Sequence, residues 1–146
     1  MPSGIPPRMP DPRPLKPASE WTDPRHRRGY AGERLAMAHL LQTGWRIEAH
    51  RFRLGHHDLD LVARRGNLVA FIEVKTRSSL RFGRPVEALG ARQRADLGRV
   101  AELWRVRFGR AEDRYRFDLI AIEESSDPST SPQVHHIEDA WRAVEK

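Results

Sequence analysis

The chain has 146 residues, of which 38% are hydrophobic, and this length allows one compact domain with a modest core. It contains no cysteine, which excludes disulfide frameworks and thiolate zinc sites. It also lacks an apolar run near the ~18 residues of a membrane span and the hydrophobic centre of a signal peptide, so we expect a cytoplasmic protein with no membrane association.

The net charge of +6 is unevenly distributed. Residues 29–109 hold 15 Arg or Lys against 8 acids, whereas residues 110–146 hold 5 against 9. A positive field of this kind favours a phosphodiester backbone as partner, because neutralised phosphates release counterions. The alternative is compositional, since 23 Arg against 3 Lys indicates a general preference for arginine, and basic surfaces can bind nothing in particular.

Residues 1–28 contain eight prolines and six basic residues, which predicts a disordered Pro/Arg-rich tail. The folded domain is expected to span residues 29–146. Its first element is a helix from Gly29 to Thr43, with Gly44 as a C-terminal stop. Its apolar residues at helical spacing are Ala31, Leu35, Ala38 and Leu41. Glu33 lies near the first turn of this helix, where the dipole favours a carboxylate.

Three strands are expected to follow this helix. Alternating apolar and polar residues predict a strand over 45–50, which leads into a loop over 51–57. Two more strands then flank the dipeptide Gly66-Asn67, which suits a two-residue hairpin turn. A three-residue or bulged turn would instead rotate the side chains of one strand to the other face.

The two-residue turn brings acidic side chains together. Counting outward pairs Arg65 with Leu68, Val62 with Phe71, Asp60 with Glu73, and Asp58 with Lys75. Asp60, Glu73 and Lys75 then share one face, where opposed like charges are destabilising unless a partner such as a cation compensates them. Two carboxylates suit Mg²⁺ or Mn²⁺, which prefer oxygen ligands. The other face is wholly apolar and should be buried: Leu59, Leu61, Ala63, Leu68, Ala70, Ile72 and Val74.

Beyond the hairpin, residues 76–85 should form a loop beside the charged strand ends. This loop carries Arg77, Arg81 and Arg84, which could grip a phosphate backbone, and Phe82, which could stack on a base or fill the core. A helix from Ala91 to Phe108 follows, with an apolar stripe of Leu97, Val100, Trp104 and Phe108. Arg92 lies off this stripe, and Gln93 is expected on the surface rather than at the charged cluster.

The last elements complete a sheet. Alternation over residues 115–121 predicts a strand reached through that helix, and a strand-helix-strand crossover implies parallel pairing. Residues 124–133 form a flexible polar linker, and residues 134–137 predict a short edge strand. The predicted fold class is α/β, with a mixed β-sheet flanked by α-helices.

Three segments together resemble the YraN-like family of bacterial proteins: Gly32-Glu33, Asp58-x-Asp60-Leu61 and Phe71-Ile72-Glu73-Val74-Lys75-Thr76-Arg77. The resemblance extends from about Gly29 to Trp141 and includes Arg81-Phe82-Gly83-x-Pro85 and His136-Ile137-x-x-Ala140-Trp141. This family in turn resembles the PD-(D/E)XK nucleases, notably the archaeal Holliday junction resolvases. Where the family usually has Gly-Glu-x-Asp-Leu, this chain has His57-Asp58-Leu59-Asp60-Leu61.

The resemblance implies a restriction-endonuclease-like three-layer fold and a metal-dependent endonuclease that hydrolyses DNA, with branched DNA and repair intermediates as candidate substrates. It implies that Asp60, Glu73 and the Val74 carbonyl hold Mg²⁺ or Mn²⁺, that Lys75 orients or activates the attacking water, and that Glu33 joins from the first helix. The nucleic-acid contacts would come from Arg77, Arg81, Arg84 and Arg92. Because resolvases act on symmetric junctions, a homodimer is also implied, and no small-molecule cofactor is expected.

Other interpretations remain open. A nucleic-acid-binding module could keep the nuclease fold without turnover, and the altered His57-Asp58 loop keeps this alternative alive. A structural ion-pair cluster without a ligand, with Asp58 paired to Lys75, is a further alternative. A zinc site at His56, His57 and Asp58, completed by His135 and His136, is disfavoured because adjacent histidines on an extended chain point in opposite directions.

Overall fold

The computed structural model describes residues 24–78 and 89–142, with side chains from Gly29 onward. Its elements in chain order are α1 (Pro24–Gln42), β1 (Arg46–Leu54), β2 (His57–Arg65), β3 (Leu68–Arg77), α2 (Ala91–Phe108), β4 (Arg114–Glu123) and β5 (Gln133–Trp141). The first helix therefore begins at Pro24, inside the stretch predicted to be a disordered tail. Residues 1–23 and most of the predicted loop at 76–85 lie outside the described residues.

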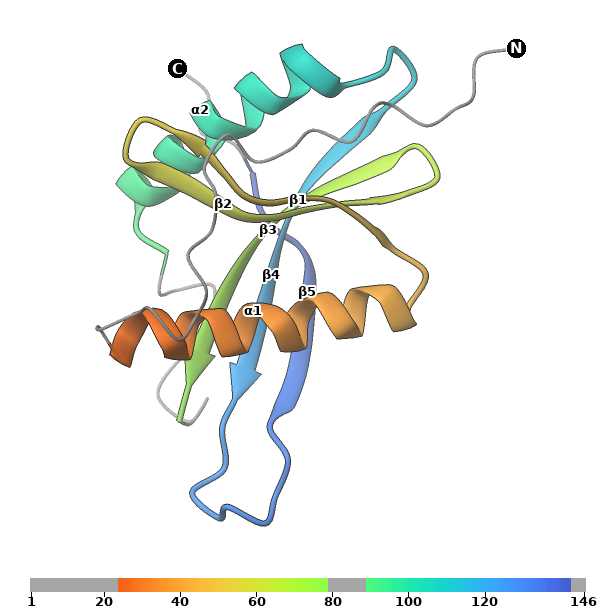
Figure 1. Cartoon of the computed structure of the whole chain (residues 1–146). Coiled ribbons are helices and arrows are strands. Elements are labelled where there is room, and N and C mark those ends of the chain that lie inside the picture. The colour runs from red at the N-terminus through yellow and green to blue at the C-terminus, as the bar shows by residue number, and fades with distance from the viewer. Residues whose placement is uncertain (1–23, 79–88, 143–146) are drawn as a thin grey trace.

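The five strands form one mixed sheet in the order β1-β2-β3-β4-β5. All neighbouring pairs are antiparallel except β3 and β4, which are parallel, as the crossover through α2 predicts. Helix α1 crosses one face of the sheet, and α2 packs on the other (Figure 1). The expected three-layer α/β architecture is confirmed, and it is compatible with a restriction-endonuclease-like fold. No helix in the described ranges is long and apolar enough to cross a membrane.

The turn at Gly66-Asn67 sets the predicted register. Gly66 has φ +63°, and the β2–β3 ladder runs from Arg65 opposite Leu68 to Leu61 opposite Ile72. The backbone pairs expected beyond this point, Asp60 with Glu73 and Asp58 with Lys75, are not part of the ladder. Strand β2 instead stays paired with β1 alone, and this two-stranded ribbon bends toward α2 (Figure 1). Asp60 and Glu73, the predicted metal ligands, therefore lie where β2 and β3 separate.

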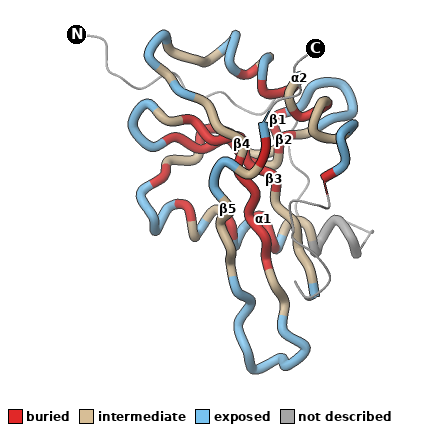
Figure 2. The backbone as a smooth tube through the Cα atoms, turned by 180° about the vertical axis from the view of Figure 1, so that it is seen from behind, coloured by how far each residue is buried: buried red, intermediate tan, exposed pale blue. Residues whose placement is uncertain are grey.

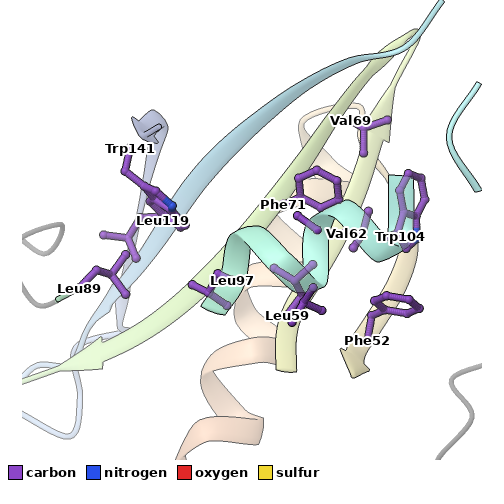
Figure 3. Close-up of a cluster of buried hydrophobic side chains, with 12 residues drawn as sticks. Phe52, Leu59, Val62, Val69, Phe71, Leu89, Leu97, Trp104, Leu119 and Trp141 are labelled. Atoms are coloured by element: carbon purple, nitrogen blue, oxygen red, sulfur yellow. The ribbon is translucent and has the colours of Figure 1, made fainter. Parts of the chain in front are cut away.

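Two hydrophobic cores cover the two faces of the sheet. The α2 core includes Phe52, Leu59, Phe71 and Trp104, which Figure 3 shows gathered against the helix. The α1 core holds most of the apolar face predicted for the hairpin, namely Leu61, Ala63, Ala70 and Ile72, with Leu68 and Val74 partly buried against it. Leu59 is buried as predicted, but it lies in the α2 core. It comes before Leu61, in the part of β2 that no longer pairs with β3.

The buried face of α1 differs from the prediction. Its buried side is made by Gly32, Glu33, Ala36 and Leu40, whereas Ala31, Leu35, Ala38 and Leu41 are exposed. A side chain at Gly32 would collide with Thr76 of β3 and touch Ile122 of β4. Small residues therefore face the sheet because the helix lies close to it.

Strand β1 is longer than predicted. Residues 51–54, expected to form a loop, remain in the strand and pair with β2, and the turn is confined to Gly55-His56. Arg51 has φ +56°, which is uncommon for a residue other than glycine, and there is a register shift between Ile47 and Ala49. These irregularities break the strict alternation of side chains on which the loop prediction depended.

The far edge of the sheet is also more extended than predicted. Strand β5 runs from Gln133 to Trp141 and does form an edge, and the segment before it connects two antiparallel strands. Asp127 organises this connection by accepting hydrogen bonds from the Ser129 backbone N–H and hydroxyl, at 2.9 and 2.8 Å. Figure 2 shows the exposed connection projecting from the buried middle of the sheet.

Candidate active site

Asp60 lies at the point where β2 leaves β3. The Val74 backbone N–H donates to Asp60 Oδ2 at 2.7 Å, so a side-chain oxygen occupies the place that a strand carbonyl would take in a continuous ladder. This bond fixes the carboxylate against the backbone of β3. The register predicted from the sequence places Asp60 beside the end of β3, as observed. Its contact with Val74 is made by the side chain and not by backbone pairing.

Asp60 and Glu73 form a coupled pair of carboxyl groups. Burial, followed by the charge and hydrogen bond of Glu73, raises the pKa of Asp60 well above its ordinary value. The charge of Glu33 acts in the same direction, while the Val74 N–H opposes the change. Two negative charges held this close in a partly buried place are mutually destabilising. A positive partner beside the pair would relieve this repulsion.

Glu73 is held by two further side chains. Lys75 Nζ lies 3.3 Å from Glu73 Oε2, and Gln93 Nε2 donates to the same oxygen at 2.7 Å. The predicted common face of Glu73 and Lys75 is therefore present. The surface position preferred for Gln93 is wrong, because the first turn of α2 points this amide at the site. Its polar side chain beside the apolar stripe was the only signal in the sequence.

Glu33 lies in α1 and faces the first strand. His50 Nε2 is 2.5 Å from Glu33 Oε1, and Arg51 Nε donates to the same oxygen at 2.9 Å. Burial alone would raise the pKa of Glu33, but the hydrogen bonds from His50 and Arg51 outweigh it and hold the pKa below its ordinary value. Neither partner has a local signature in the sequence, since both contacts join distant segments and Arg51 makes its contact from a left-handed backbone position.

Asp58 does not extend the β2–β3 ladder toward Lys75. It lies opposite Arg53 of β1, whose Nε is 3.3 Å from Asp58 Oδ1. The next residue toward the turn, His57, reaches the other way, and its Nδ1 is 3.6 Å from Asp96 Oδ2 on α2. The altered loop therefore connects the β1–β2 turn to α2.

The predicted nucleic-acid contacts are only partly described. Arg77 is partly buried at the end of β3, where its Nη1 donates to the Thr76 carbonyl at 3.0 Å. Arg92 is exposed in the first turn of α2 and lines a hollow of about 540 Å³ beside the β1–β2 turn. Arg81 and Arg84 lie outside the described residues.

The donor set suits a hard divalent cation. Asp60 and Glu73 offer carboxylate oxygens, the ligands that Mg²⁺ and Mn²⁺ favour, and a cation would relieve the repulsion that raises the pKa of Asp60. Among the side chains of residues 29–78 and 89–142, no group of three or more His, Asp or Glu is placed to hold a metal ion. Mg²⁺ does not require one, since it usually binds one or two carboxylates and completes its shell with water and phosphate.

The part of the chain that contains these residues matches a known protein family. The model of Uncharacterised protein family UPF0102 matches residues 32–122, which include Glu33, Asp60, Glu73 and Lys75. A UPF0102 protein of Symbiobacterium thermophilum is 39% identical over 99 residues, covering 68% of this chain and 84% of the relative. UPF0102 proteins of Chloroherpeton thalassium and Mesorhizobium japonicum are 34% and 42% identical, covering 80% and 66% of this chain and 94% and 77% of the relatives. The YraN-like resemblance is thus confirmed, and the chain belongs to the UPF0102 family.

Proposed function

We propose that this protein is a metal-dependent endonuclease that hydrolyses phosphodiester bonds in DNA, with branched DNA and repair intermediates as candidate substrates. The observation that carries the proposal is the coupled Asp60–Glu73 pair with the Lys75 amine beside it. A pair of carboxyl groups whose charges oppose each other is costly to maintain unless the charges serve a ligand.

The chain's own residues divide the work between them. Asp60 and Glu73, together with the Val74 carbonyl, would hold Mg²⁺ or Mn²⁺. Such an ion, when bound, polarises a phosphate and lowers the pKa of a bound water. Lys75, one of only 3 lysines in a chain with 26 basic residues, offers a compact ammonium that can orient the attacking water.

Two neighbours keep the carboxylates in place. The Gln93 amide holds Glu73 from α2, and the Val74 N–H holds Asp60 from β3. Glu33 would act from α1 through its negative charge, which already raises the pKa of Asp60. Arg77 at the end of β3 and Arg92 in the first turn of α2 would contact the phosphates of the substrate backbone.

The test is cleavage of labelled linear, flapped and four-way DNA with Mg²⁺ or Mn²⁺. We expect wild-type protein to cut at least one substrate, and Asp60→Ala, Glu73→Ala and Lys75→Ala each to lower the rate at least about 100-fold, the lower end of the range for losing a positioned acid–base group. Glu112→Ala is the matched control, because Glu112 is an exposed acid in the connection before β4. Unchanged cleavage in the Asp60 and Glu73 variants would refute the proposal.

A second candidate is a nucleic-acid-binding module without turnover. It is favoured by the contact between Lys75 and Glu73, which partly neutralises the cluster without any ion. Under this alternative, DNA affinity persists in EDTA and falls with salt, and none of the three DNA shapes is cut. Cleavage that depends on Glu73 excludes it.

A further inference from the structure

A hollow adjoins the carboxylate pair and is not used by the hydrolysis just described. It has a volume of about 540 Å³ and lies between the β1–β2 turn and the first turns of α2. We propose that it receives one unpaired nucleobase beside the phosphate that is cut, so that the substrate carries an unpaired nucleotide rather than being a continuous duplex. This inference rests on the proposed function and names its substrate class.

The hollow shares residues and backbone with the site. Gln93 lines it and also donates to Glu73, and Asp58 lines it two residues before Asp60 on the same strand. Two residues of extended protein chain span about 6.5 Å, which is comparable to the distance between successive phosphates of a DNA strand. A base placed in the hollow would therefore belong to a nucleotide next to the scissile phosphate.

The charges of the hollow fit a base better than a phosphate. Asp58 and Asp96 both line it, and carboxylates repel a phosphodiester. They can instead accept hydrogen bonds from exocyclic amines, such as N4 of cytosine. Arg92 also lines it and is exposed, so it could contact the phosphate that follows the base. The hollow thus combines acceptors for a base with a cation for the backbone.

Both carboxylates are fixed in place, and Asp96 retains capacity for a ligand. Asp96 is held by Arg99 through Oδ1 and by His57 through Oδ2. Arg53 holds Asp58 at 3.3 Å. An ionised carboxylate offers about four lone-pair sites, so the two contacts of Asp96 leave room for a further donor.

The hollow is large enough to admit a base, and imidazole rings lie on its wall. Its volume is in the range of small-molecule pockets, roughly 300–1,000 Å³. His56 and His57 line it, and imidazole rings stack on unpaired bases. The side chain of His57 is 49% exposed, so its ring is accessible to a ligand. A paired base cannot enter such a hollow, because its edge and faces are covered within the duplex.

The test measures binding without cleavage, by fluorescence anisotropy in EDTA. It compares a continuous duplex with the same duplex carrying one bulged cytosine, one bulged thymine or one bulged abasic site. We expect the bulged cytosine to bind about tenfold tighter than the abasic bulge, within the range for stacking one base on an aromatic side chain. Thymine should bind more weakly than cytosine, since it lacks the exocyclic amine.

Variants connect this preference to the hollow. His57→Ala and Asp96→Asn should each lower the preference for cytosine over the abasic bulge to within about twofold while leaving affinity for the continuous duplex unchanged. His135→Ala and Asp127→Asn are the matched controls, because both residues are partly or fully exposed at the β4–β5 edge. Thermal melting of each variant verifies that it is folded, and His57→Gln serves as the milder substitution if His57→Ala melts early.

The outcomes separate this inference from the proposed function. Equal affinity for cytosine and abasic bulges, or an unchanged preference in both variants, overturns the inference even if DNA is cut. Displacement of the bulged DNA by free deoxycytidine monophosphate at a similar concentration overturns it in favour of a free nucleotide as ligand. A base preference that both variants abolish, without cleavage of any substrate, supports the inference and refutes the endonuclease.

Discussion

At the scale of single residues, the surroundings of Asp60 oppose the ionisation of its carboxyl group. It is fixed by the Val74 N–H, and burial, followed by the charge of the adjacent Glu73, raises its pKa. A carboxyl group with a raised folded-state pKa keeps its proton more tightly when the protein is folded. Stability therefore falls as the pH rises from the ordinary aspartate pKa of about 3.9 toward the raised value.

Asp60→Asn should therefore stabilise the metal-free protein at pH 7.5. We expect a higher free energy of unfolding, because asparagine carries no charge that burial would penalise at this pH. Mg²⁺ should raise the melting temperature of the wild type but not that of the variant, because a ligand stabilises only the state that binds it. Melting in EDTA and in Mg²⁺ measures both effects. Asp127→Asn is the control, since hydrogen bonds from Ser129 lower the pKa of Asp127 and its replacement should not stabilise. A less stable Asp60→Asn in EDTA would contradict the argument.

The residues of the site were predicted more fully than their partners. Asp60, Glu73 and Lys75 could be found because two-residue periodicity and a two-residue turn place them by counting. For Gln93 a surface position was preferred over the contact that it makes with Glu73, and His50 and Arg51 were missed as partners of Glu33. Those contacts depend on how helices approach the sheet and on a left-handed residue within a strand, neither of which has a local signature.

At the scale of elements, the end of α1 depends on a glycine. Gly44 has φ +90°, and the Trp45 N–H returns to the Leu40 carbonyl at 2.9 Å to close the helix. This is the glycine stop that the sequence predicted. Helix α2 contains a glycine of the opposite kind, Gly98, where an added Cβ would meet no atom within 4 Å.

Substitution by alanine should therefore have opposite effects at these two positions. Gly44→Ala should cost about 1–2 kcal/mol of unfolding free energy, because a side chain disfavours the left-handed backbone. Gly98→Ala should add about 0.5–1 kcal/mol, because it removes a flexible residue from a helix interior. Urea denaturation of both variants beside the wild type measures the difference. Destabilisation by Gly98→Ala would show that this face of α2 is more crowded than its surroundings indicate.

The strands are joined at the other end of β2 by a buried ion cluster. Arg64 Nε donates to Glu48 of β1 at 2.6 Å, and its two terminal nitrogens donate to Asp113, before β4, at 2.7 and 2.8 Å. The side chains of Arg64 and Asp113 are 5% and 0% exposed. Burial alone would raise the pKa of Asp113, but the hydrogen bonds from Arg64 reverse this and hold it below its ordinary value.

Arg64→Ala should cost about 3–5 kcal/mol, because it leaves Asp113 buried without its paired cation and leaves Glu48 with Arg46 alone. A group with a lowered folded-state pKa contributes stability above its ordinary pKa of about 3.9 and loses it as the pH falls through the folded-state value. The difference between wild type and variant should therefore narrow in acid. Denaturation at pH 7 and at pH 3 tests this. Arg105→Ala is the control, since Arg105 forms an exposed pair with Glu102 within α2 and its loss should change stability far less.

The same elements show how far the sequence determines the fold. Helix α2, the hairpin turn and the parallel β3–β4 pair were all predicted, because each depends on local spacing or on connection length. The buried face of α1 was predicted wrongly, since Leu35 and Leu41 carry more apolar surface than Gly32 and Ala36, which the structure buries. Close packing against β3 selects small residues there, and that depends on a neighbour distant in sequence.

At the scale of the whole molecule, basic and acidic residues are concentrated in different parts of the fold. The excess of basic residues lies in residues 29–109, which carry the site, and the acidic excess lies in residues 110–146. Strand β4, its turn and the edge strand β5 come from the acidic part. A polyanion should therefore approach from the side of α2 and the β1–β2 ribbon rather than from β5.

Salt dependence measures this asymmetry. The logarithm of DNA affinity should fall linearly with the logarithm of salt concentration, with a slope of about 0.9 for each phosphate contacted. Arg92→Gln should reduce the slope by about 1, and Arg114→Gln, an exposed arginine at the start of β4, should leave it unchanged. Anisotropy titrations over a salt series give both slopes. Equal effects of the two variants would indicate diffuse attraction instead of an oriented surface.

The hydrogen bond between Val74 and Asp60 also makes the backbone a reporter of occupancy. The Val74 amide proton points at a carboxylate oxygen that would be shared with any incoming ion. A cation withdraws electron density from that oxygen, weakens the bond and shifts the nitrogen and proton resonances of Val74. Val69, on the same strand within the continuous ladder, would keep its resonance. Protein labelled with ¹⁵N-valine would thus reveal the ligand through nuclear magnetic resonance, without a dye and without turnover.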